Sequence, residues 1–125
     1  MKTFASLMER KMLITNFGYQ KIPSPIFDLT GKVPEGADLL KVQWRNGGTK
    51  EEFPIAMEDW KEFALTFRMG YGNIEAGVNK YQLSFWEGAQ LRGLGILYLE
   101  THFEEKKFGD AVLYIDEKAG TLRDE

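Results

Sequence analysis

Apolar and polar residues alternate most clearly in the middle of the chain. Residues 40–45 alternate, Asn46-Gly47-Gly48 intervenes, and residues 53–57 alternate again. A period of two is that of a half-buried strand, and Asn and Gly readily take the positive φ angles of tight hairpin turns. The pattern predicts a β-hairpin. Because Pro54 lacks a backbone donor, we expect either that its strand lies at a sheet edge or that this position faces away from the neighbouring strand.

Further segments carry β-branched and aromatic residues or apolar alternation. They span residues 13–19, 26–29, 78–87, 91–103 and 110–116. The segment 91–103 has apolar residues on both faces, which predicts a central strand. The charged run 104–109 is predicted to be the turn before the last strand.

Two segments have helical spacing instead. Four apolar residues from Trp60 to Phe67 fall at i, i+3, i+4 and i+7, which predicts an amphipathic helix over about residues 58–69 with Trp60 in the core. Residues 3–12 predict a short N-terminal helix by the same spacing.

Together these elements predict an α+β fold. We expect a small antiparallel β-sheet of about five or six strands, with the short N-terminal helix and the 58–69 helix packed on it. A chain of 125 residues fits one domain over 1–125, with a polar tail over about 117–125.

The composition of the chain excludes several common kinds of catalytic site. The chain has no cysteine and one histidine, His102, which excludes thiolate nucleophiles, zinc–thiolate sites and multi-histidine metal sites. Its serines lack the sequence context of a nucleophile, and adjacent carboxylates such as Glu51-Glu52 are interpreted as surface charge. We therefore expect a non-enzymatic protein without catalytic residues, metal or cofactor. A carboxylate-based hydrolase remains the enzymatic alternative.

Aromatic and cationic residues on neighbouring predicted strands suggest a binding site. Aromatic rings stack on bases, and arginine pairs with phosphate. The candidate ligand-binding residues are Trp86, Arg92, Tyr98, Gln82, Ser84, Arg45 and His102. The ligand implied is small and anionic or nucleotide-like, while the alternative is that the aromatic residues form the core. Gly93 and Gly95 do not complete a phosphate-binding motif and predict a bulge or close backbone approach.

The net charge of −3 and pI of about 5.3 disfavour long nucleic acid as a partner. An acidic surface also fits an alternative function, a protein–protein inhibitor or immunity protein that meets a basic partner. We expect a cytoplasmic homo-oligomer without membrane attachment. Its size and composition would suit a viral or mobile-element accessory factor in the host cytoplasm.

One local resemblance supports a second alternative. Residues Pro54–Phe63, a predicted strand running into a predicted helix after a hairpin, are similar to the strand-to-helix junction of the single-stranded-DNA-binding domains of transcriptional coactivators. The resemblance implies a single-stranded nucleic-acid-binding domain.

Overall fold

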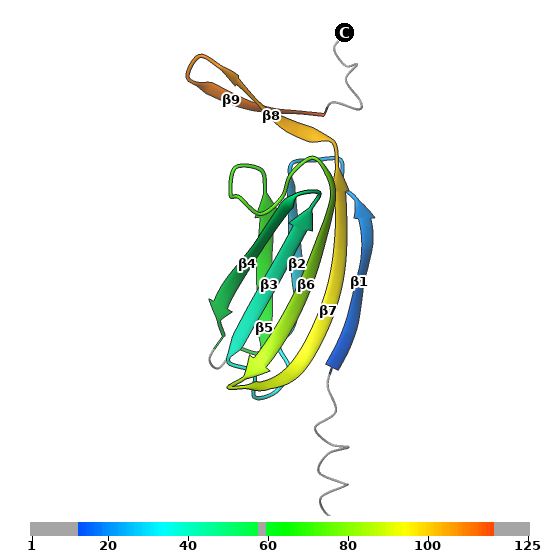
Figure 1. Cartoon of the computed structure of the whole chain (residues 1–125), viewed down its shortest axis with the longest axis vertical. Helices are drawn as coiled ribbons and strands as arrows, with labels where there is room; N and C mark the ends of the chain where they lie inside the picture. Colours follow the sequence, from blue (N-terminus) through cyan, green and yellow to red (C-terminus); the bar gives the residue numbers. More distant parts are fainter. Residues whose placement is uncertain (1–12, 58–59, 117–125) are drawn as a thin grey trace, which may run out of the picture.

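The computed structural model describes residues 13–57 and 60–116, and all of its regular elements are β-strands. The strands are β1 (Leu13–Lys21), β2 (Ile26–Lys32), β3 (Leu39–Asn46), β4 (Thr49–Ala56), β5 (Glu62–Arg68), β6 (Gly77–Glu87), β7 (Gln90–Thr101), β8 (Phe103–Phe108) and β9 (Ala111–Asp116). Figure 1 shows a sandwich of two sheets, with a hairpin extending beyond one end.

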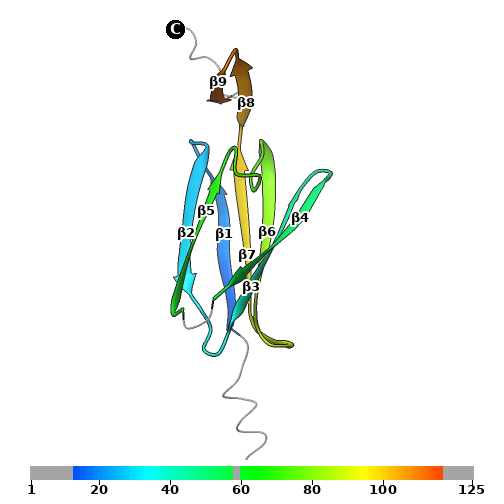
Figure 2. The same ribbon diagram turned by 90° about the vertical axis from the view of Figure 1, so that its left-hand side faces the viewer.

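The larger sheet has the order β1-β7-β6-β3-β4, and the smaller one pairs β2 with β5. Figure 2 shows the small sheet lying against one face of the large sheet. Aromatic rings join the two layers: Phe67 lies 4.3 Å from Tyr81, and Phe63 lies 5.5 Å from Phe85, measured between ring centroids. The core therefore sits between the sheets, and the other face of the large sheet, called here the outer face, is turned away from it.

Several predicted strands are confirmed. The hairpin β3–β4 turns at Gly47-Gly48, and β4 is an edge strand, one of the two arrangements that Pro54 indicated. The predicted central strand is β7, which pairs with β6 on one side and β1 on the other.

The α+β class is wrong, because the described residues contain no helix. The predicted helix over 58–69 is replaced by β5, while residues 58–59 lie outside the described residues. Phe63, Leu65 and Phe67 also alternate with polar or small residues, so the segment fits a period of two as well. Pairing with β2 decides between the two patterns. Trp60, predicted in the core, is 49% exposed.

The strand-to-helix junction over Pro54–Phe63 is absent for the same reason, since β4 is followed by another strand. The predicted N-terminal helix over 3–12 and the tail over 117–125 lie outside the described residues. The large sheet is also mixed rather than antiparallel, because β1 runs parallel to β7.

The charged run 104–109 is not a turn. Its residues form β8, which pairs with β9 around a turn at Gly109-Asp110. Figures 1 and 2 both show this hairpin extending from the end of β7, beyond the two packed sheets. We call residues 103–116 the arm.

The two glycines in β7 serve close packing, as expected. A Cβ on Gly95 would overlap the ring of Phe17, and one on Gly93 would lie 2.7 Å from Cγ of Pro34. The β6–β7 register also shifts next to Gly93. These positions therefore let neighbouring side chains reach the strand and do not form a gap for a ligand.

Candidate functional site

The outer face carries three cations directly across from one another on adjacent strands. Lys50 of β4 lies opposite Arg45 of β3, and Arg45 lies opposite Lys80 of β6. We call these three residues the cation row. Like charges directly opposite on a sheet destabilise it, so this arrangement is not explained by folding.

All three side chains of the cation row are exposed. Among the residues that the structure describes, no carboxylate forms a salt bridge with any of them. Glu52, the nearest acidic residue on the same face of β4, instead accepts a hydrogen bond from Gln43 at 3.4 Å. The row is thus a local positive charge on a chain whose net charge is −3.

Two tyrosines continue the line of the cation row across the sheet. Tyr98 of β7 lies opposite Lys80, and Tyr19 of β1 lies opposite Tyr98. The tyrosine rings stack with centroids 5.7 Å apart, and the Lys80 ammonium lies 5.9 Å from the Tyr98 centroid. The Tyr98 ring therefore has a neighbour on each side and offers no open face to a base.

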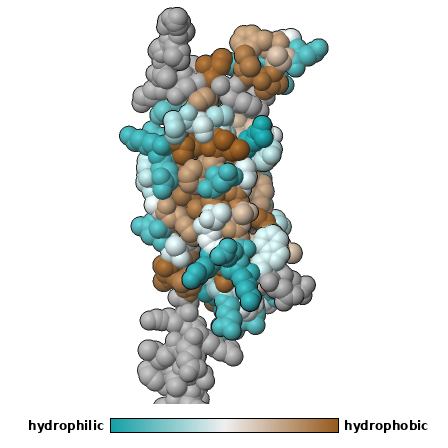
Figure 3. Space-filling model, turned by 180° about the vertical axis from the view of Figure 1, so that it is seen from behind, coloured by the Kyte–Doolittle hydropathy of each residue, from teal (hydrophilic) through white to brown (hydrophobic). Residues whose placement is uncertain are grey.

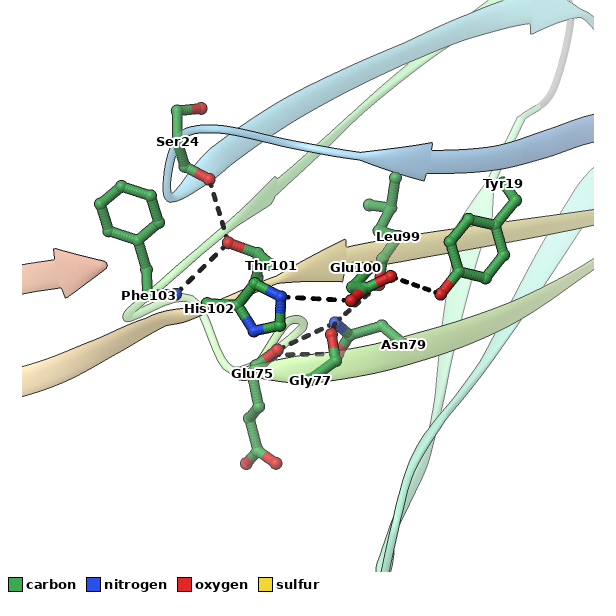
Figure 4. Close-up of polar contacts among 10 residues, drawn as sticks. All are labelled: Tyr19, Ser24, Glu75, Gly77, Asn79, Leu99, Glu100, Thr101, His102 and Phe103. Carbon is green, nitrogen blue, oxygen red and sulfur yellow. Dashed lines mark hydrogen bonds and ion pairs between the residues drawn. The ribbon is translucent and has the colours of Figure 1, made fainter. Parts of the chain in front are cut away.

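Glu100 accepts hydrogen bonds at the end of β7 nearest the arm, as Figure 4 shows. The Tyr19 hydroxyl donates to Glu100 Oε1 at 2.6 Å, and His102 Nε2 lies 3.1 Å from Oε2. The hydrogen bond from Tyr19 lowers the pKa of Glu100, and the same contact raises the pKa of Tyr19. Because His102 is the single residue between β7 and β8, this contact holds the base of the arm.

At the other end of the outer face, Trp86 and Ser84 are engaged with each other. The indole N–H of Trp86 donates to Ser84 Oγ at 2.9 Å, and the Lys41 ammonium lies 5.2 Å from the Trp86 ring centroid. Both side chains therefore already have partners within the protein.

Arg92 is also engaged. Its guanidinium lies 2.6 Å from a carboxylate oxygen of Glu87, and the Arg92 side chain is only 12% exposed. Arg92 lies where the β6–β7 register shifts, so no residue of β6 lies directly opposite it. The Arg92 guanidinium is thus already paired with a carboxylate and is not free to bind a phosphate.

The structure brings some of the predicted site residues together and separates others. Arg45 and Gln82 line one shallow hollow of about 130 Å³ with Gln43 and Lys80. Tyr98 stands beside Lys80, His102 lies at the base of the arm, and Trp86 with Ser84 lies further down the same face. Three other aromatic residues of β3 and β6, Trp44, Tyr81 and Phe85, are buried in the core.

Sequence reasoning missed Lys50, Lys80 and Tyr19. The hairpin turn at Gly47-Gly48 fixes Lys50 opposite Arg45, so this pair was within reach of a register argument. Lys80 and Tyr19 meet their neighbours only through pairing of strands distant in sequence, which no local pattern indicates.

Asn79 forms a second polar cluster, buried beneath the outer face. Its side-chain oxygen accepts from the Trp44 indole at 2.9 Å and from the Asn46 amide at 3.0 Å, and its nitrogen donates to the Leu99 carbonyl at 3.0 Å. Figure 4 shows part of this network. All of its hydrogen-bonding capacity is used internally, so the cluster is structural.

Metal-ligating side chains do not gather in the described residues. No group of three or more His, Asp or Glu side chains there could hold a metal ion. The same part of the chain contains no helix with the length and hydrophobicity that crossing a membrane requires.

Comparisons with protein-family models, with curated protein sequences and with solved structures found no match to this chain, so the geometry of the outer face carries the functional argument.

Proposed function

We propose that the protein is a non-enzymatic binding domain that holds an acidic segment of another protein against its outer face. The observation that carries this proposal is the cation row: three exposed cations without carboxylate partners in the described chain, placed side by side across β4, β3 and β6. Such a placement costs stability in the free protein, and an acidic partner would relieve the repulsion.

The surroundings of the cation row favour a protein over a small ligand. Two hollows adjoin the row, of about 130 Å³ and about 270 Å³, and both are smaller than the roughly 300–1,000 Å³ of usual ligand pockets. Nucleic acid is disfavoured as well, because Tyr98 has Tyr19 on one side and Lys80 on the other. Base stacking needs an aromatic face that is open.

The rest of the outer face has the character of a protein interface. Along β1 and β7, Ile14 is 71% exposed and Tyr19 is 51% exposed, while Leu94 and Ile96 are half-buried. Ile14 lies opposite Leu94 in the parallel register, so these side chains adjoin. An apolar half next to a cationic half matches the mixed composition of binding surfaces between proteins.

Titration with a hexaglutamate peptide, followed by two-dimensional amide NMR, tests the proposal. We expect shift changes concentrated at residues 43–45 and 80–82, and binding that weakens as salt is added. Arg45→Glu is expected to weaken binding at least about tenfold, because it reverses the middle charge of the row.

Lys32→Glu is the matched control, because it makes the same charge change at an exposed position on β2, in the other sheet. It should leave the affinity within about twofold of the wild type, since separate surface charges are largely screened in salt. Equal losses in the two variants, or shifts scattered over both sheets, would contradict the proposed site.

A further inference from the structure

We propose that the acidic segment bound at the outer face is the arm of a second copy of this chain. This inference rests on the function proposed above and names its partner. The same chain then supplies both the binding surface and the element that it binds.

Beyond its base, where Phe103 packs against the core, the arm is formed by two strands that contact mainly each other. An isolated two-stranded hairpin is marginally stable in water. Yet Phe108 is 57% exposed and Leu113 is 51% exposed, and Figure 3 shows hydrophobic surface on the arm beyond the sandwich. Packing against another molecule would cover these side chains and stabilise the hairpin.

The register of the arm places Phe108, Ala111 and Leu113 on one face, while Val112 lies on the other. Lys106 pairs with Leu113, and Phe108 pairs with Ala111, so these four positions share one face of the hairpin. Glu104 belongs to the same face, where its carboxylate lies 3.9 Å from the Lys106 ammonium. This face therefore combines an apolar strip with the Glu104–Lys106 ion pair, and the excess negative charge of the arm belongs to the hairpin as a whole.

The outer face has the complementary arrangement. Its apolar half runs along β1 and β7, and the cation row lies beside it on β6, β3 and β4. The arm carries four acidic residues and two lysines, so its net charge opposes that of the row. In the proposed contact, the apolar strip of the arm packs against the apolar half of the outer face, and Glu104 lies toward Lys80. This contact covers exposed apolar side chains on both surfaces and brings a carboxylate to the cation row.

The direction of the arm makes the contact intermolecular. Figures 1 and 2 show it extending away from the sandwich, beyond the end of its own outer face. A copy that donates its arm to a second copy leaves its own outer face free for a third. Such a head-to-tail contact gives a ring if the rotation closes and a filament if it does not.

Two full-length variants, each defective in one partner surface, test the proposal. Leu113→Asp places a charge in the apolar strip of the arm, and Arg45→Glu reverses the centre of the cation row. Sedimentation velocity over about 10–500 µM should show wild-type assembly beyond a dimer, while each variant alone stays monomeric. An equimolar mixture of the two should form dimers and nothing larger, because only one intact arm and one intact face remain.

A mixture that stays monomeric, or wild-type protein that stays monomeric throughout this range, would overturn the proposal. Both substituted positions are exposed, so both variants should fold. At a concentration where the wild type is monomeric, Leu113→Asp should melt near the wild type, and Arg45→Glu should melt no lower, because it relieves the repulsion within the cation row. If Leu113→Asp lowers the melting temperature, Phe108→Asp replaces it as the arm variant. If hexaglutamate binds at the cation row but the protein does not self-associate, the second copy is not the partner, and the proposed function stands. If neither peptide binding nor self-association is observed, both the proposed function and this inference are refuted.

Discussion

Replacing Gly95 with alanine is expected to destabilise the protein by about 3 kcal/mol, the upper part of the usual range for overpacking a core. Gly95 lies on β7, where the ring of Phe17 from β1 crosses over it, and an added Cβ would overlap that ring. The ring cannot retreat freely, since it also meets the Phe63 ring edge-on at 6.1 Å. Chemical denaturation, monitored by tryptophan fluorescence, measures the change in unfolding free energy.

Two further variants test whether the loss comes from a clash with the Phe17 ring. Gly48→Ala is the control, because a Cβ there would have no heavy atom within 4 Å, and it should change stability by less than about 0.5 kcal/mol. Phe17→Leu should reduce the cost of Gly95→Ala, because the smaller side chain leaves room for the methyl group. Additive losses in the double variant would contradict a clash between these two residues.

Replacing Asn79 with alanine is expected to cost about 3 kcal/mol as well, because buried polar groups would lose their partners. The Trp44 indole N–H and the Leu99 carbonyl both bond to this side chain, which is fully buried. It also accepts from the backbone N–H of Glu75 at 3.0 Å and so holds the loop before β6. Thermal and denaturant unfolding should both report the loss.

Gln20→Ala is the matched control for Asn79→Ala, since it also removes a side-chain amide, but at an exposed position of β1. Its effect should stay within about 0.5 kcal/mol. A loss at Asn79 no larger than at Gln20 would mean that water replaces the network without cost.

The local sequence pattern was sufficient to predict one pair of strands that are close in sequence. The hairpin β3–β4 was predictable because its alternation, its glycine turn and Pro54 all indicate the same structure. The segment from Trp60 to Phe67 fits both periods, and only its pairing with β2 selects the strand. That pairing joins residues at least thirty positions apart, for instance Lys32 with Glu62, and a single sequence does not display it.

The first strand of the arm, β8, was predicted wrongly as a turn because charge dominates residues 104–107, whereas β9 was predicted as a strand. A charged run is normally interpreted as a turn, because a half-buried strand needs apolar residues at every second position. A hairpin that extends beyond the sandwich has no face against its own core, so it does not need this alternation. A strand rich in Glu and Lys is compatible with such a position, and paired backbone hydrogen bonds define it instead.

The candidate site was predicted in part. Arg45, Gln82 and Tyr98 share the outer face because each falls at an outward position of a strand that the sequence indicated. Arg92 stays a prediction as a ligand-binding residue, and its pairing with Glu87 was not foreseen because it depends on the register shift between β6 and β7. The cation row itself needs the lateral order of three strands, which follows from the tertiary structure.

Zero-length carbodiimide cross-linking between copies tests the central claim most directly, because it joins lysine amines to carboxylates that are in contact. In an equimolar mixture of ¹⁵N-labelled and unlabelled wild-type protein, we expect mixed-isotope cross-links that join Glu104 to Lys80 or Lys50. These links should disappear in the Leu113→Asp variant. Mixed-isotope links that avoid the cation row, or that persist unchanged in Leu113→Asp, would contradict the account.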